Sequence, residues 1–229
     1  MNEDTREASG RPDKFHQNLE ALRGKLMALA GLVQTALSRS IAAFWERDPA
    51  LARSVIKGDA PINDLEVDID EDCIRLVALY QPVAVDLRVI MAVDHIIAEL
   101  ERIGDLAVNM AEEALELTGL ASEAQHPQVL IMARKVQEMV SRSLEAFKNR
   151  DAALARRVCA DDDEVDALDR SLTRELLQNL AASREVAPAD QSQVNIVRHL
   201  ERVGDHATNI AEQAVYMVEG KNVRHRCQG

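Results

Sequence analysis

Two segments of the chain carry carboxylate and amide side chains at helical spacing. Residues 100–112 read LERIGDLAVNMAE and residues 200–212 read LERVGDHATNIAE, with nine of 13 positions identical. In a helix, side chains four residues apart stack on one face. Oxygen ligands stacked in this way could bind divalent or trivalent metal ions such as iron, zinc, manganese or magnesium. The primary metal-binding candidates are Glu101, Asp105, Asn109, Glu201, Asp205 and Asn209.

Other oxygen-bearing side chains could complete these sites. Some extend the same two helix faces, and others lie upstream, where Asp59 pairs with Asp162 and Asn63 with Asp166 at an offset of 103. The four-residue spacing within each upstream pair again favours a shared face. The secondary candidates are Asp59, Asn63, Asp94, Glu112, Asp162, Asp166 and Glu212.

The alternative interpretation of an acidic helix face is that it is simply solvated. A solvated face usually mixes both signs of charge, whereas these stripes hold no Lys or Arg and recur in both segments. Gly104 and Gly204 follow on the same turn, and an interior glycine costs a helix about 1 kcal/mol relative to alanine. We therefore expect another backbone or a ligand to approach closely there.

The helices that must position these residues form an internal repeat. Residues 38–55 and 141–158 match at 12 of 18 positions at an offset of 103, close to the offset of 100 found above. Each copy is expected to contain three helices, with Asp48-Pro49, Pro82, Pro127, Asp151 and Pro188 marking helix starts and a possible interruption near residues 58–61. The fold class is all-α, as two tandem three-helix bundles; one merged six-helix bundle remains an alternative.

The same pattern predicts the domain boundaries. A disordered tail is expected over residues 1–12, the first three-helix repeat over 13–118 and a linker over 119–126. The second repeat is expected over 127–220, with a tail over 221–229.

Composition narrows the classes of function. A net charge of −12 disfavours binding to nucleic acid and to an anionic membrane. No signal peptide or run of about 18–20 apolar residues is evident, so direct membrane insertion is not expected. The three cysteines are widely spaced and odd in number, which favours reduced thiols in the cytoplasm. No phosphate-binding loop, HExxH or GxSxG motif occurs, and no nucleophile–base pair can be argued, so no catalytic residue is proposed.

The two ExxxD segments, together with residues 81–88 (QPVAVDLR), resemble the PhoU family of accessory proteins of phosphate-specific transport. The resemblance covers residues 13–220 and implies two three-helix bundles with multinuclear metal sites. It carries a ligand role onto Glu101, Asp105 and Asn109, and onto Glu201, Asp205 and Asn209. Residues 186–193 (VAPADQSQ) lack a QPVAVDLR equivalent, so the equivalence of the two metal sites is open.

The resemblance also implies a function. It predicts a non-enzymatic negative regulator of phosphate uptake and starvation signalling, linking a phosphate ABC transporter ATPase to a sensor histidine kinase. We further expect a homodimer that is cytoplasmic and reaches the inner membrane only through its protein partners. The alternatives are a metal-dependent phosphoester hydrolase and a metal-binding structural bundle.

Overall fold

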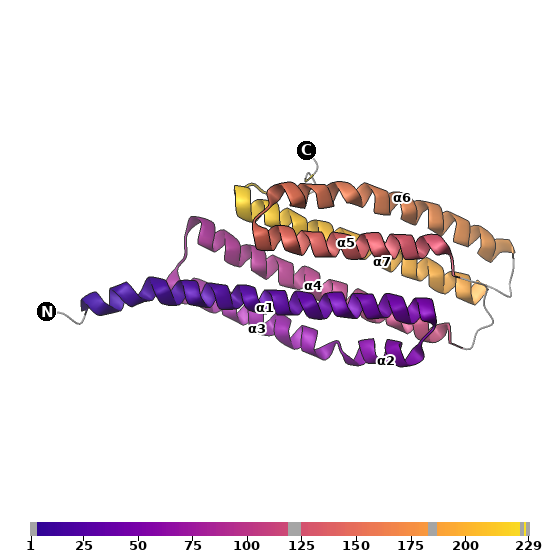
Figure 1. Ribbon diagram of the computed structural model, residues 1–229, viewed down its shortest axis with the longest axis horizontal. Coiled ribbons are helices and arrows are strands. Elements are labelled where there is room, and N and C mark those ends of the chain that lie inside the picture. Colours follow the sequence, from indigo (N-terminus) through magenta and orange to yellow (C-terminus); the bar gives the residue numbers. More distant parts are fainter. Residues whose placement is uncertain (1–3, 119–124, 183–186, 225–226, 228–229) are drawn as a thin grey trace.

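The structure, a computed structural model, describes residues 4–118, 125–182, 187–224 and 227. In these residues every regular element is a helix (Figure 1). The helices are α1 (Asp4–Glu46), α2 (Pro49–Lys57), α3 (Ala60–Tyr80), α4 (Ala84–Glu116), α5 (Pro127–Asn149), α6 (Ala152–Ala182) and α7 (Ala187–Glu219). The predicted all-α fold class is confirmed.

Each sequence repeat folds as one bundle. Helices α1 to α4 pack on one another, α5, α6 and α7 do the same, and the two bundles lie side by side (Figure 1). They join mainly through α4 and α7, with a smaller contact between α1 and α5, and their buried side chains form one continuous hydrophobic core. The two-bundle architecture therefore holds, although the bundles share a core.

The first repeat differs from the second by one helix break. Helix α2 ends at Gly58, whose backbone N–H bonds to the carbonyls of Ser54 and Val55, and Pro61 lies in the first turn of α3. A proline there lacks the N–H needed to continue a helix. At the matching positions the second repeat has Asp161 and Glu164, and α6 runs on unbroken.

The predicted helix starts have the expected local chemistry. The Asp48 carboxylate accepts hydrogen bonds from the N–H groups of Ala50 and Leu51, at 2.8 and 3.1 Å. Asp151 does the same for Leu154 at 2.9 Å. These caps satisfy donors that the first turn of a helix leaves free.

The N-terminal helix begins earlier than expected. Helix α1 starts at Asp4, so most of the predicted disordered tail over residues 1–12 is helical, and residues 1–3 lie outside the described residues. The segment contains helix formers such as Glu7 and Ala8 as well as Gly10 and Pro12, which disfavour a helix, so propensity alone did not predict the early start.

One helix of the described residues also passes a length and composition test for a membrane span. This is Lys14–Glu46, with a mean hydropathy of 1.3 over its most apolar window. No such stretch was predicted from the sequence, because scattered polar residues interrupt the apolar run. In the structure Leu22, Leu26 and Val33 from this helix are at most 1% exposed and lie in the shared core.

The cysteine prediction was wrong for two of the three thiols. Cys159 of α6 and Cys227 form a disulfide, with their Cα atoms 6.0 Å apart, while Cys73 is free and buried. The predicted tail over residues 221–229 thus contributes the buried Cys227 and the partly buried Val223 to the fold; residues 225–226 and 228–229 lie outside the described residues. A separation of 68 residues gave no signal of this contact.

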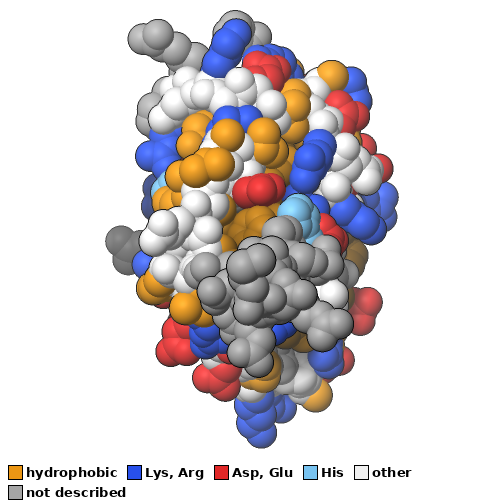
Figure 2. Space-filling model, turned by 90° about the vertical axis from the view of Figure 1, so that its left-hand side faces the viewer, with side chains coloured by type: hydrophobic (Ala, Val, Ile, Leu, Met, Phe, Trp, Pro, Cys, Tyr) orange, Lys and Arg blue, Asp and Glu red, His pale blue; other side chains and the backbone are white. Residues whose placement is uncertain are grey.

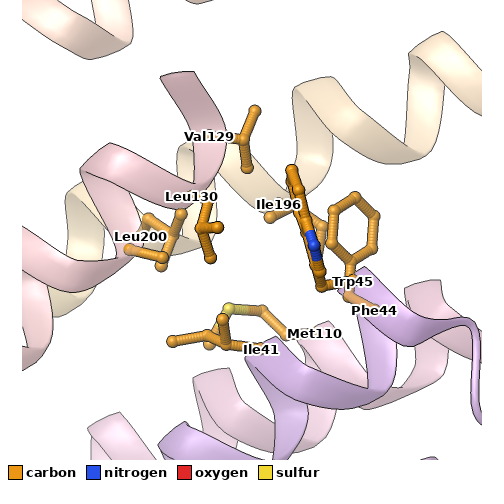
Figure 3. Close-up of a pocket in the computed structure, with 9 residues that line it drawn as sticks. Ile41, Phe44, Trp45, Met110, Val129, Leu130, Ile196 and Leu200 are labelled. Atoms are coloured by element: carbon orange, nitrogen blue, oxygen red, sulfur yellow. The ribbon is translucent and has the colours of Figure 1, made fainter. Parts of the chain in front are cut away.

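The junction between the repeats is tightly packed. Figure 3 shows Ile41, Trp45, Met110, Val129 and Leu200, drawn from α1, α4, α5 and α7, turned toward one small apolar space. Its volume is only about 10 Å³, roughly the minimum that holds one water molecule. The chain has a single tryptophan, so Trp45 is an intrinsic fluorescent reporter of this junction.

We expect Leu200→Ala to destabilise the protein by about 2–5 kcal/mol, because truncating a fully buried leucine leaves a cavity. Urea unfolding followed by Trp45 fluorescence measures the loss. The matched control is Leu177→Ala, since Leu177 is 46% exposed and its truncation should change stability by less than about 0.5 kcal/mol. Equal effects of the two substitutions would contradict the shared core.

Candidate metal-binding faces

The glycines of α4 and α7 mark where another helix approaches. A Cβ atom built on Gly104 would lie 3.4 Å from the Ile62 side chain and 3.8 Å from Asp59 Oδ1. A Cβ atom on Gly204 would lie 3.4 Å from Val165 and 3.5 Å from Asp162 Oδ1. The expected close approach is therefore made by side chains, including one carboxylate in each repeat, and not by a second backbone.

These contacts bring together carboxylates from two helices in the first repeat. We call Asp59, Glu66, Glu101 and Asp105 acidic face 1. Burial raises the pKa of Glu101, and the negative charges of Asp105, Glu66 and Asp59 raise it further. Arg102 opposes them, since its guanidinium lies 3.3 Å from Glu101 Oε2 and 3.1 Å from Asp105 Oδ2. Acidic face 1 is thus partly neutralised from within.

The second repeat gathers more carboxylates. We call Asp162, Asp166, Asp169, Glu201 and Asp205 acidic face 2. Burial raises the pKa of Glu201 to about 7, aided by the charges of the other four carboxylates. Burial likewise raises the pKa of Asp162 to about 6, with Asp205 and Asp166 adding to it. Like charges held this close favour either a bound proton or a bound cation.

The fit of a metal ion to these faces can be tested on the side chains themselves. Asp59 Oδ1 is buried and has no hydrogen-bond partner, which leaves an acceptor that a cation could satisfy. Carboxylate oxygens are the ligands that hard cations take. Within the described residues, however, no three His, Cys, Asp or Glu side chains already converge on one point as a metal shell. A metal ion must therefore draw these carboxylates together by rotation of their side chains.

Two predicted ligands, Asn109 and Asn209, are not part of either acidic face. Asn209 donates a hydrogen bond of 3.0 Å to Glu99 Oε2 of α4, and His206 Nδ1 lies 2.6 Å from the same oxygen. Burial would raise the pKa of Glu99, but these two hydrogen bonds outweigh it and lower that pKa. The Asn209 amide therefore joins the two repeats across the α4–α7 contact, a use that the helical spacing could not reveal. Its counterpart Asn109 is half-buried on α4.

Some of the secondary ligand candidates border an acidic face, and others lie elsewhere. Asn63 donates a hydrogen bond of 2.8 Å to Asp59 Oδ2 and so borders acidic face 1. Asp94 lies beside Asp70 of α3. Burial is the main cause that raises the pKa of Asp94, the charge of His95 opposes it, and the charge and hydrogen bond of Asp70 raise it further. Glu112 is exposed, whereas Glu212 is only 6% exposed. This last pair therefore differs between the repeats despite its matching place in the sequence.

Two members of the acidic faces were not among the ligand candidates predicted from the sequence. Glu66 and Asp169 are related by the same offset of 103 as Asp59 and Asp162, and each lies seven residues after its partner. Seven residues are close to two turns of a helix. The offset and the spacing together could have identified this pair.

The raised pKa of Glu201 predicts how the metal-free protein responds to pH. An acid whose pKa rises from 4.5 to about 7 on folding destabilises the folded state as pH increases through that window, because the unfolded chain releases the proton more readily. Glu201→Gln resembles the protonated acid and has no such dependence. With chelator present, we expect its melting temperature to exceed that of the wild type at about pH 8, the difference vanishing below about pH 4.5.

Glu145→Gln is the matched control, because it removes one negative charge from an exposed position on α5. Its melting curve should run parallel to that of the wild type across the same pH range. If the melting temperature of Glu201→Gln also runs parallel to that of the wild type across this pH range, the charge of Glu201 on acidic face 2 does not destabilise the folded state.

The comparisons with known proteins agree with this architecture. The PhoU domain family matches residues 26–114 and 129–214, one match in each repeat. The phosphate-specific transport system accessory protein PhoU of Escherichia coli K12 is 36% identical over 216 residues, spanning 93% of this chain and 88% of its own length. A homologue so named in Aquifex aeolicus is 39% identical over 213 residues, spanning 93% of this chain and 96% of its own.

Solved structures extend the likeness to three dimensions. The crystal structure of PhoU from Pseudomonas aeruginosa has a TM-score of 0.87 at 37% identity, covering 90% of this chain and 100% of its own. The phosphate transport system regulatory protein PhoU from Streptococcus pneumoniae has a TM-score of 0.85 at 29% identity, covering 91% and 99%. With both repeats matched in sequence and nearly the whole chain matched in structure, the chain belongs to the PhoU family.

Proposed function

We propose that this protein is a negative regulator of phosphate uptake and of phosphate-starvation signalling. The observation that carries the proposal is the match along both repeats to proteins named as accessory or regulatory parts of phosphate transport systems. A regulator of this kind acts by contact with other proteins. The negative charge of −12 agrees with that, because it disfavours control through nucleic acid.

The two acidic faces support a metal-binding form of this regulator. Asp59, Glu101 and Asp105 would hold a cation on acidic face 1, and Glu201 and Asp205 would hold one on acidic face 2 with their neighbours on α6. A bound iron, manganese, zinc or magnesium ion would neutralise the repelling carboxylates and tie α4 to α3, and α7 to α6. Arg102 pairs with two of the four carboxylates of acidic face 1, whereas Arg170 pairs with one of the five of acidic face 2, Asp166. We therefore expect acidic face 2 to bind metal more tightly than acidic face 1.

The partners we propose are the ATPase of a phosphate ABC transporter and a sensor histidine kinase. An adaptor between them would be cytoplasmic, would reach the inner membrane only through these partners, and could act as a homodimer. The Cys159–Cys227 disulfide is more typical of oxidising compartments. A thiol assay on protein isolated without reductant would measure how much of it forms in the cell.

We expect Glu201→Gln/Asp205→Asn to lose most of the metal bound at acidic face 2, because both charges go while size and hydrogen bonding are kept. Elemental analysis after dialysis against limiting metal measures this loss. Glu101→Gln/Asp105→Asn should lower the remaining metal in turn.

The matched control is Glu138→Gln/Glu145→Gln, which removes two charges from the exposed side of α5 in the same repeat. Its metal content should equal that of the wild type. If all three double variants bind the same amount of metal as the wild type, the acidic faces are merely solvated.

We expect deletion of this protein to raise phosphate uptake and to keep starvation genes active even when phosphate is abundant. The reason is that its contacts are proposed to hold both processes down. Phosphate uptake and a starvation-promoter reporter measure the effect in high-phosphate medium, and removing the kinase as well should silence the reporter. A deletion strain that still responds normally to phosphate would refute the proposed role.

A further inference from the structure

A second surface feature lies beside acidic face 1 and borders it at Glu66. An open groove of about 520 Å³ runs between α3 and α4. Its apolar lining is formed by Cys73, Ile74, Val77, Ala78, Ile90 and Met91. Ile74 is 62% exposed although it lies on a helix with a well-packed opposite side. The groove thus presents apolar surface to solvent.

Further exposed apolar side chains lie at the end of the molecule where α3 passes into α4. There Val83 and Val85 are 75% and 43% exposed. Figure 2 views this end and shows hydrophobic side chains at the surface beside acidic ones. Exposed apolar surface with a polar rim is typical of a protein-binding site.

The other end of the groove is acidic. Asp70 and Asp94 line it, and Glu66 follows one turn earlier on α3, where the charges of Asp70 and Asp94 act on it. The groove lining that the structure describes includes no Lys or Arg. A ligand must therefore supply positive charge at one end and apolar surface at the other.

The second repeat shows that the fold does not require this combination. At an offset of 103, Asp70 corresponds to Thr173, and at an offset of 100, Asp94 corresponds to Val194 and Met91 to Gln191. Both carboxylates are thus absent from the matching helix pair, and two apolar lining residues are replaced, since Ile90 corresponds to Asp190 at the offset of 100. The lining from α3 stays apolar, with the exposed Ile74 kept as the exposed Leu177.

We propose that the groove between α3 and α4 docks a basic amphipathic helix of a partner protein. Apolar side chains at positions i, i+3 or i+4, and i+7 of that helix would fill the groove. A Lys or Arg one or two turns away would then face Asp70 and Asp94. The inference rests on the proposed adaptor function for the existence of a protein partner, and it names the surface that the partner uses.

The charges favour this occupant over two others. A second copy of this chain placed on the groove by two-fold symmetry would set Asp70 and Asp94 against either the same carboxylates or the apolar end of the other groove, and neither supplies positive charge. An anionic lipid surface would be repelled by them in the same way. A positively charged helix gains from both features of the groove, because salt bridges form where its apolar face is buried.

A peptide binding assay tests the groove on the full-length protein. The probe is a labelled 18-residue amphipathic helix of Leu and Lys, measured by fluorescence anisotropy at physiological salt. We expect it to bind the wild type and to bind Ile74→Glu at least about tenfold more weakly, as for a residue central to an interface. Asp70→Asn/Asp94→Asn should weaken binding to a similar degree without changing the apolar lining.

Matched controls separate the groove from general charge attraction. Leu177→Glu places the same substitution at the corresponding position of the second repeat and should bind as the wild type does. A Ser and Lys peptide of equal charge should bind much more weakly. Binding that is equal for the two peptides, or unchanged in Ile74→Glu, would overturn the proposal.

The same variants in cells separate this inference from the proposed function. Ile74→Glu should raise starvation-gene expression in high phosphate toward the level of a deletion strain, while Leu177→Glu should not. If the deletion raises expression and Ile74→Glu does not, the groove is not the docking site but the regulatory role stands. If the deletion itself has no effect, the regulatory role fails, and the peptide assay still decides whether the groove binds a basic helix.

Discussion

The packing of α4 against α7 is the contact on which the rest of this structure depends. Ile103 and Val203 are fully buried on the apolar sides of these helices, which fix the rotation of each helix about its own axis. Once that rotation is set, Glu101 and Glu201 must face away from the shared core, toward α3 and α6. Gly104 and Gly204 then leave room for Ile62 and Val165, which bring Asp59 and Asp162 into place. Burial of apolar surface thus assembles groups that would otherwise repel one another.

That assembly leaves each acidic face with unbalanced charge. Acidic face 2 holds five carboxylates, and the charges of Asp205 and Asp166 add to the effect of burial on the pKa values of Glu201 and Asp162. In the first repeat Arg102 supplies part of the missing positive charge, yet Asp59 Oδ1 still has no hydrogen-bond partner. A cation bound between two helices would relieve both strains, and it would also make the packing of those helices sensitive to metal.

The sequence predicted the fold well because its signals were periodic and repeated. The stripe from Glu101 to Asp105, its copy from Glu201 to Asp205, and the upstream pair Asp59 and Asp162 all followed from helical spacing and two offsets. What it could not predict depends on which helix lies opposite. Periodicity gives the direction of a side chain but not its neighbour, so the bond from Asn209 to Glu99 and the Cys159–Cys227 disulfide were not foreseen. The groove was missed for the same reason, since α3 and α4 each carry only half of it.

The most direct test of this account is the melting temperature of the wild-type protein with chelator and with increasing concentrations of manganese, iron(II), zinc or magnesium. A ligand that binds only the folded state at 100 times its Kd stabilises it by about 2.7 kcal/mol, which for a chain of this length corresponds to a rise of about 5–10 °C. The account predicts such a rise for at least one of these metals, together with a weaker dependence of the melting temperature on pH. A melting temperature that is identical with chelator and with each metal at saturating concentration would contradict it.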